Sequence, residues 1–222
     1  EAAIRPRGDH FPVSRLLCVE NTANRGGGTV WPIEQLRAVA RVARAAGLSV
    51  HLDGARLWNA AAASGVALAD WAACADTVSV CLSKGLGAPA GSLVATSAAL
   101  AARVRRLRKR LGGGLRQAGH LAAAGLWALD HHLPRIAEDH EKARRLADAL
   151  VRVPGLGVEP PETNILFVAL PAGLTADTLL ARLREKGVLA GTDAPNRVRL
   201  VTHLDVSMED CEEAARRIAA CL

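Results

Sequence analysis

The first half of the chain alternates short apolar runs with stretches in which apolar residues recur at helical spacing. Residues 16–20 (LLCVE) are an apolar run that ends in a polar, glycine-rich segment at 21–28, which predicts a buried strand followed by a loop. Pro32 stands where a first helical residue belongs, and apolar residues then recur every three or four positions until Gly47. Two later apolar runs predict further strands at residues 48–53 and 77–82.

This alternation predicts an α/β fold with a mostly parallel sheet, because each helix returns the chain to begin the next parallel strand. A further strand is expected at residues 92–96 and a helix at 97–110, after which glycines at 112–114 interrupt the pattern. Two more helices are expected at 116–132 and 135–151.

The segment beyond Pro154 is built from shorter units. They are a strand at 164–169, a helix at 175–186, a strand at 197–201 and a final helix with Ser207 as its N-cap and Asp210 three residues later. We therefore expect two domains, a larger α/β domain over residues 1–133 and a small C-terminal α+β domain over 134–222.

The composition is that of an ordinary globular protein. With 222 residues, 50% of them hydrophobic and 23% charged, the chain is able to bury a sizeable core. Its five cysteines are scattered without a CxxC pair, which favours reduced thiols in the cytoplasm over a disulfide framework or a zinc site. No apolar window is long enough to span a membrane. The chain begins with Glu1 rather than Met, so we expect the sequence to start inside a longer reading frame.

The net charge of +6 would suit an anionic partner, but it does not identify one. The chain has no tyrosine and only two phenylalanines to stack on bases, so we expect no nucleic acid. A basic helix of this kind is usually a solvated face or a site for a small anion. Its basic residues are Arg103, Arg105, Arg106, Arg108, Lys109 and Arg110, followed by Arg116.

Lys84 is a candidate nucleophile because it follows a predicted strand and precedes the small residues of segment 85–89 (GLGAP). A lysine buried at such a position has a lowered pKa and forms an imine readily with an aldehyde. The alternative is a lysine that reaches solvent from a turn, and spacing alone favours this alternative.

Asp53 and Glu20 end neighbouring predicted strands, so they and Lys84 should meet at the carboxyl edge of the sheet, where ligands bind in such folds. An acid beside a protonated ring nitrogen is what pyridoxal phosphate requires. Two alternatives stay open: Asp53 caps a helix and pairs with Arg56, or His51 and Asp53 bind a metal, for which no third ligand is evident.

Five segments in order resemble the low-specificity threonine aldolases over nearly the whole chain. They are residues 20–32 (ENTANRGGGTVWP), 51–56 (HLDGAR), 83–89 (SKGLGAP), 111–119 (LGGGLRQAG) and 199–206 (RLVTHLDV). The resemblance implies the large domain of an aspartate-aminotransferase-like pyridoxal-phosphate enzyme, with an αβα sheet and part of its N-terminal region missing. It also implies a homodimer or homotetramer whose sites lie between subunits.

The resemblance assigns roles to individual residues. Lys84 would hold pyridoxal phosphate as a Schiff base, Asp53 would pair with the ring nitrogen and Arg56 would neighbour the ring hydroxyl. Arg116 and Lys109 would reach the cofactor phosphate of the adjacent subunit. Arg199 would pair with the substrate carboxylate through two parallel hydrogen bonds.

The activity implied is the retro-aldol cleavage of L-threonine or L-allo-threonine to glycine and acetaldehyde, in threonine catabolism and glycine formation. His203 follows the strand that carries Arg199 and is interpreted as structural, and no role is assigned to the other histidines. Two alternatives are another lyase of the same fold acting on a different β-hydroxy or an aromatic amino acid, and a weakly active or non-catalytic binding subunit.

Two features depart from the family pattern. The family has a histidine after Glu-Asn-Thr that handles the substrate hydroxyl, where this sequence has Ala23, so we expect weaker catalysis rather than none. The family's Gly-Thr phosphate loop and the histidine that stacks on the cofactor have no counterpart among these residues. We therefore expect the 222-residue chain alone to bind pyridoxal phosphate poorly, and near-stoichiometric Schiff-base absorbance that is lost in Lys84→Ala would contradict this.

Overall fold

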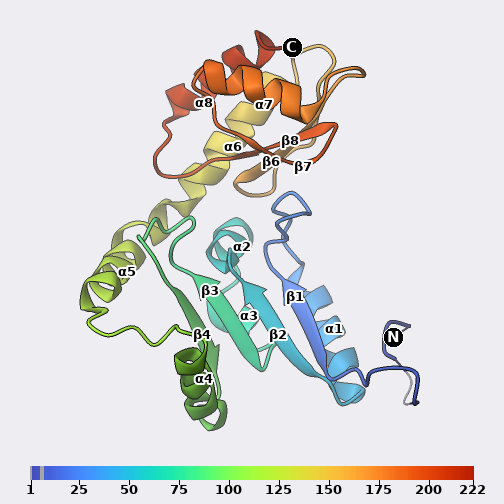
Figure 1. Ribbon diagram of the computed structural model, residues 1–222, viewed down its shortest axis with the longest axis vertical. Helices are drawn as coiled ribbons and strands as arrows, with labels where there is room; N and C mark the ends of the chain where they lie inside the picture. Colours follow the sequence, from blue (N-terminus) through green and yellow to red (C-terminus); the bar gives the residue numbers. More distant parts are fainter. Residues whose placement is uncertain (1, 6–7) are drawn as a thin grey trace.

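The computed structural model describes residues 2–5 and 8–222, so Glu1, on which the expectation of a longer reading frame rests, lies outside the described residues. The chain forms two lobes, each with a four-stranded sheet (Figure 1). The first sheet has the order β1-β2-β3-β4, in which β1 to β3 are parallel and β4 is antiparallel to β3. Its strands are β1 (Leu16–Glu20), β2 (Ser49–Gly54), β3 (Thr77–Cys81) and β4 (Ser92–Thr96).

One face of the first sheet is covered by helices. Val50 and Leu52 of β2 are each 1% exposed and pack with Leu36 and Trp71 from the helices. Because side chains alternate along a strand, His51 and Asp53 of β2 point to the opposite face, where both are only partly buried. The helices of this cluster are α1 (Ile33–Ala45), α2 (Leu57–Ser64) and α3 (Leu68–Ala72).

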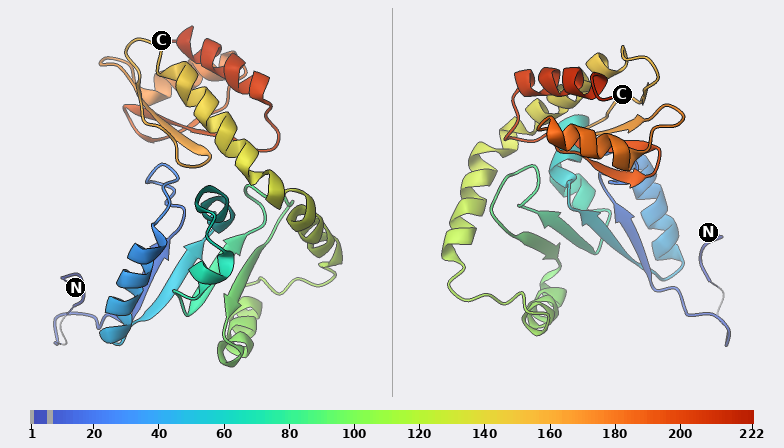
Figure 2. Two further views of the ribbon diagram at one scale, coloured as in Figure 1. Left: turned by 180° about the vertical axis from the view of Figure 1, so that it is seen from behind. Right: turned by 45° about the horizontal axis from the view of Figure 1, so that its top comes forward.

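Two more helices continue the first lobe, α4 (Ala98–Arg110) and α5 (Gly119–His131). No residue of α4 is buried. The short 3-10 helix η1 (Leu133–Arg135) then leads into α6 (Ile136–Leu150), which runs obliquely from the first lobe to the second (Figure 2). The domain boundary expected after residue 133 falls in this passage and stays a prediction.

The second lobe has an antiparallel sheet of order β5-β6-β8-β7. Its apolar core joins the sheet to helices, and Val168, Leu179 and Val198 are each 0% exposed. The elements are β5 (Gly157–Val158), β6 (Ile165–Ala169), α7 (Ala176–Glu185), β7 (Gly191–Ala194), β8 (Arg197–Val201) and α8 (Met208–Ala219).

The structure confirms the α/β class and most of the expected elements. The strands expected at 16–20, 92–96 and 197–201 have the expected bounds, and the capping box at Ser207 is formed. The helix expected from residue 116 begins later, at Gly119, because Gln117 has φ 48°, a left-handed conformation that does not continue a helix. In the described part of the chain, no helix has the length and apolar character that crossing a membrane would require.

Candidate active site

The carboxyl ends of β1, β2 and β3 lie side by side, as the sequence predicts. Glu20 stands opposite Asp53 in the parallel register. The Oδ1 atom of Asp53 accepts a hydrogen bond from the Ala55 N–H group, 3.1 Å away, which orients the carboxylate at the strand end. The Nδ1 atom of His51 lies 2.8 Å from the Thr77 hydroxyl. The described residues contain no group of three His, Cys, Asp or Glu side chains that would hold a metal.

The alternative in which Asp53 caps a helix and pairs with Arg56 lacks support in this geometry. The N-cap of α2 is Arg56, and no side chain caps that helix. In the described part of the chain no ion pair within 4.0 Å joins Asp53 to Arg56. The carboxylate of Asp53 therefore remains available to a ligand.

Lys84 lies in a tight loop that follows β3. The N–H group of Gly87 donates to the Lys84 carbonyl at 2.8 Å, and the N–H group of Ala88 donates to the Leu82 carbonyl at 3.0 Å. Gly87 has φ +67°, a conformation that favours glycine. Lys84 is exposed, which agrees with the alternative of a lysine that reaches solvent from a turn and not with a buried lysine. The physical reason is that the loop closes through backbone groups and buries Leu82 and Leu86 instead.

The Lys84 loop forms one wall of a pocket of about 670 Å³ between the two lobes. We call this space the Lys84 pocket. Residues of both lobes line it, among them Arg56, Lys84, His132, Asn164, His203 and Leu204. The pocket therefore exists only when the second lobe is seated on the first.

Of two arginines with lowered pKa values, Arg56 lines the Lys84 pocket, whereas Arg199 does not line it but is near enough for its charge to act on Arg56. Burial, followed by the nearby charge of Arg199, lowers the pKa of Arg56. Burial also lowers the pKa of Arg199. The Nη2 group of Arg199 donates to the Asn24 side-chain oxygen at 2.8 Å, but its buried Nε group has no hydrogen-bond partner among the described residues. A buried donor without a partner costs free energy, so this guanidinium is suited to an anionic ligand.

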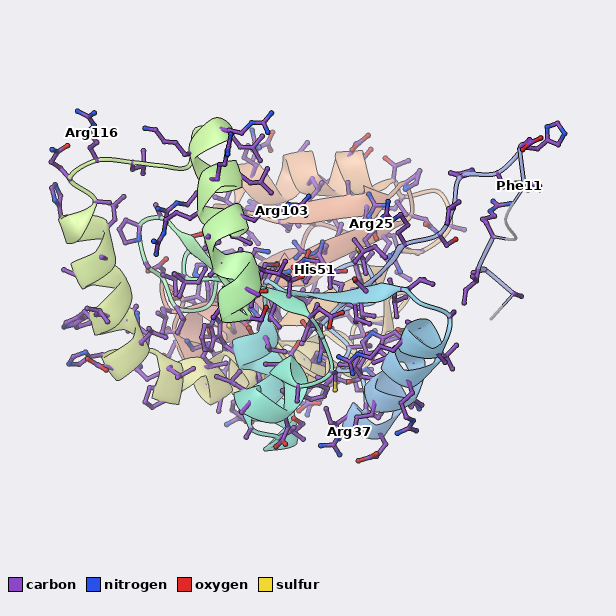
Figure 3. The ribbon with its side chains drawn as sticks, turned by 90° about the horizontal axis from the view of Figure 1, so that it is seen from below. Phe11, Arg25, Arg37, His51, Arg103 and Arg116 are labelled. Carbon is purple, nitrogen blue, oxygen red and sulfur yellow. The ribbon has the colours of Figure 1, made fainter. Side chains whose placement is uncertain are left out.

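Lys109 and Arg116 lie outside the Lys84 pocket. Both side chains are exposed, Lys109 near the end of α4 and Arg116 in the loop before α5. Figure 3 shows Arg116 at the outer edge of the molecule, pointing away from it. Their role toward the cofactor of an adjacent subunit stays a prediction.

A buried polar cluster, which the sequence did not reveal, connects the lobes beneath the Lys84 pocket. The Nδ2 group of Asn59, on α2, lies 3.1 Å from Nε2 of His140 on α6 and 3.3 Å from Oδ1 of Asn164, the residue before β6. These three side chains are 1%, 3% and 4% exposed. The Asn164 amide also donates to the Thr202 carbonyl at 2.9 Å. Asn59 thus fastens the first lobe to both α6 and the second sheet.

A buried ion pair extends this cluster along α6. The Nζ group of Lys142 lies 3.0 Å from Oδ1 of Asp139 and donates to the His203 carbonyl at 3.2 Å. Burial raises the pKa of Asp139, although the hydrogen bond from Lys142 opposes that shift. His203, interpreted from the sequence as structural, accepts this hydrogen bond with its backbone carbonyl and also lines the Lys84 pocket. The sequence signal for these contacts is weak, since the partners are far apart along the chain.

The chain is similar to known proteins over nearly its whole length. Residues 1–172 match the family model described as "Beta-eliminating lyase". The chain is 44% identical over 218 residues to "Probable low-specificity L-threonine aldolase 2" of Arabidopsis thaliana, covering 96% of this chain and 61% of that protein. It is 42% identical over 219 residues to "Low specificity L-threonine aldolase" of Escherichia coli K12, covering 99% of this chain and 64% of that protein. The chain thus spans about three fifths of the length of these curated relatives.

Solved structures share the fold. A putative L-allo-threonine aldolase from Listeria monocytogenes superposes with a TM-score of 0.80 at 22% identity, covering 96% of this chain and 62% of that one. The threonine aldolase of Leishmania major superposes with a TM-score of 0.78 at 22% identity, with the same coverage of 96% and 62%. The expected aspartate-aminotransferase-like fold is confirmed, since an aspartate aminotransferase from Rhodobacter sphaeroides also superposes, with a TM-score of 0.71 at 24% identity, over 93% of this chain and 56% of that one.

Proposed function

The chain belongs to the beta-eliminating lyase family, and from this premise we propose that it is a pyridoxal-phosphate-dependent threonine aldolase that cleaves L-threonine and L-allo-threonine to glycine and acetaldehyde. The relatives named threonine aldolases, at 42% to 44% identity, support this proposal. The observation that carries it is the meeting of Lys84 and Arg56 in one pocket, beside an arginine whose buried Nε group lacks a partner.

The side chains of the site fit pyridoxal phosphate. Lys84 offers an accessible primary amine for the aldehyde, and Asp53 offers a carboxylate that no cation pairs at close range among the described residues. Arg56 offers a half-buried cation. Lys84 would hold the cofactor covalently, while Asp53 and Arg56 would hold its ring nitrogen and ring hydroxyl. When bound, pyridoxal phosphate supplies an electron sink for the electron pair of the broken Cα–Cβ bond.

Arg199 is proposed to bind the carboxylate of the amino-acid substrate. Its Nη2 group is held by Asn24, so the guanidinium is oriented before substrate arrives. The partnerless Nε group would donate one hydrogen bond to the carboxylate, and a planar guanidinium allows a second, parallel bond. This contact would orient the substrate so that its Cα–Cβ bond is the one that breaks.

We further propose a homodimer or homotetramer with shared active sites, in the cytoplasm, acting in threonine catabolism and glycine formation. Lys109 and Arg116 support the assembly because they are exposed and lie away from the pocket of their own chain, which leaves them free to meet a neighbouring one. The five cysteines, all free thiols, suit a reducing compartment. Light scattering of the purified chain would give the subunit number, and a monomer with full activity would contradict shared sites.

The test of the proposed reaction is product analysis. The chain, incubated with pyridoxal phosphate and either L-threonine or L-allo-threonine, is expected to release glycine and acetaldehyde in equal amounts. Lys84→Ala should abolish release, whereas Lys186→Ala, a change at an exposed lysine of the second lobe, should leave it unchanged. Cleavage of other β-hydroxy or aromatic amino acids only would favour the alternative lyase. Absence of cleavage, with binding to an active subunit, would favour the non-catalytic alternative.

A further inference from the structure

His132 follows α5 directly and lies on the wall of the Lys84 pocket. Its Nδ1 atom is 2.6 Å from the Leu86 carbonyl oxygen, in the same loop as Lys84. A carbonyl oxygen only accepts hydrogen bonds, so Nδ1 must carry the proton and donate it. The ring packs edge-on against Trp127, with 4.7 Å between centroids and 88° between planes. The imidazole is therefore held in one orientation from two sides.

The other ring nitrogen of His132 is left as a proton acceptor. In a neutral imidazole only one nitrogen carries a proton, so protonation of Nδ1 leaves a lone pair on Nε2. Nε2 has no hydrogen-bond partner among the described residues, and it does not belong to their buried unpaired atoms.

The other titratable groups that line the pocket are less suited to accept a proton. The Nδ1 atom of His203 accepts from the Asp205 N–H group at 3.3 Å, so its neutral form carries the proton on Nε2, which is then a donor and not an acceptor. The Asp205 side chain is 92% exposed and lies 3.4 Å from His203. Arg56 and Arg135 are cations, and Arg135 is paired with Glu138 at 3.0 Å. Lys84 is committed to the cofactor in the proposed function.

We propose that Nε2 of His132 accepts the β-hydroxyl proton of the substrate during the cleavage, an assignment that rests on the proposed function. The O–H bond breaks and its proton moves to Nε2, while the O–H electron pair forms the carbonyl double bond of the released aldehyde. The Cα–Cβ bond breaks, its electron pair stays with Cα, and a proton returned to Cα completes glycine. The Leu86 carbonyl stabilises the imidazolium that forms, because it accepts from Nδ1.

The chain offers substitutions that separate this role from simple loop support. In His132→Asn the side-chain amide stands close to the position of Nδ1, so it keeps the donor to Leu86 and removes the acceptor. His132→Leu removes both. His131→Asn is the matched control, because His131 is the preceding residue, is exposed and bonds instead to the Trp127 carbonyl at 2.8 Å.

In the holoenzyme, His132→Asn should lower kcat for threonine by about 10²- to 10⁴-fold, the usual contribution of general base catalysis, with little change in KM. Capture of pyridoxal phosphate by Lys84 and the melting temperature should stay as in the wild type. His132→Leu should additionally weaken capture, since the loop loses its anchor. An unchanged kcat in His132→Asn, or an equal loss in His131→Asn, would overturn the proposal.

A second readout does not depend on turnover. Nitrogen NMR of the histidine-labelled chain should show the His132 ring protonated at Nδ1 and unprotonated at Nε2, and the Nε2 signal should shift when pyridoxal phosphate and threonine are added together. A neutral ring protonated at Nε2, or an Nε2 signal that does not shift when pyridoxal phosphate and threonine are added, would overturn the assignment. If the wild type cleaves no β-hydroxy amino acid, the proposed function fails, and the substrate-induced shift alone then decides whether His132 faces the ligand.

Discussion

At the scale of single residues, Arg199 shows how the site is prepared for an anion. Its guanidinium is fixed through Asn24, yet one buried donor remains open. The sequence placed Asp53 and Lys84 at the ends of predicted strands, whereas Arg56 and Arg199 received their roles from the resemblance to the threonine aldolases. The sequence did not identify His132 or Asn59. The hydrogen-bond partner of His132 lies 46 positions away and those of Asn59 lie 81 and 105 positions away, so only the packing of the lobes brings them together.

The first prediction concerns substitution of Arg199 by lysine. An ammonium cannot form two parallel hydrogen bonds with a carboxylate, so Arg199→Lys should lose about 1.5–3 kcal/mol of substrate binding. Steady-state kinetics should show KM for threonine raised by roughly 10- to 100-fold. The control is Arg197→Lys, on the same strand but paired with Asp193 at 2.6 Å. Equal effects of the two substitutions would argue against a carboxylate contact at Arg199.

The second prediction concerns the pH dependence of stability at His140. Burial lowers the pKa of His140 to about 4, so the folded state favours the neutral ring and the unfolded chain binds more protons between pH 4 and about 6.5. The free energy of unfolding contributed by His140 is therefore present above about pH 6.5 and is lost as the pH falls toward 4.

Chemical denaturation at several pH values checks this. The wild type should lose about 2–3 kcal/mol from this group across that window. His140→Gln should flatten the decline, whereas His120→Gln, at an exposed site, should keep the wild-type slope. A wild-type slope that survives His140→Gln would contradict the assignment.

At the scale of elements, strands and helices with a clear period were predictable and the short ones were not. Helix α2 has the sequence LWNAAAAS, in which the run of alanines gives no periodic apolar face. The strand β7 reads GTDA and is wholly polar or small, and β5 has two residues. These elements are stabilised by packing against neighbouring strands and helices, and the local sequence pattern does not reveal that packing.

The third prediction concerns the capping of α8. The Ser207 side chain accepts from the Asp210 N–H group at 3.0 Å, and the Asp210 carboxylate accepts from the Ser207 N–H group at 2.8 Å. Ser207→Ala should therefore lower the free energy of unfolding by about 1 kcal/mol. Ser97, the N-cap of α4, makes no side-chain capping bond, so Ser97→Ala is the control and should change stability little. Equal effects in thermal unfolding would refute the capping argument.

At the scale of the whole molecule, the two lobes are joined by more than α6. The cluster of Asn59, His140 and Asn164 connects them, and the Lys84 pocket lies between them. The position of one lobe relative to the other must therefore be kept for the pocket to keep its shape. The sequence predicted two domains but carried no signal for how they are fastened, because buried amides in isolation look like ordinary polar residues.

The fourth prediction tests this connection through Asn59→Ala. The change leaves the buried groups of His140 and Asn164 without their shared donor, which should cost about 1–3 kcal/mol of unfolding free energy. Capture of pyridoxal phosphate should weaken in parallel, because the pocket wall loosens. The exposed Asn196→Ala serves as the control. A stable Asn59→Ala chain with unchanged capture would show that the cluster does not hold the lobes in place.

The central claim is that Lys84 holds pyridoxal phosphate. The chain contains four lysines, Lys84, Lys109, Lys142 and Lys186, so the claim can be tested residue by residue. The chain is incubated with saturating pyridoxal phosphate, reduced with borohydride, digested and mapped by mass spectrometry. We predict a single pyridoxyl modification on Lys84, which is absent from Lys84→Ala. Modification of another lysine in place of Lys84, or no modification at saturation, would contradict the account.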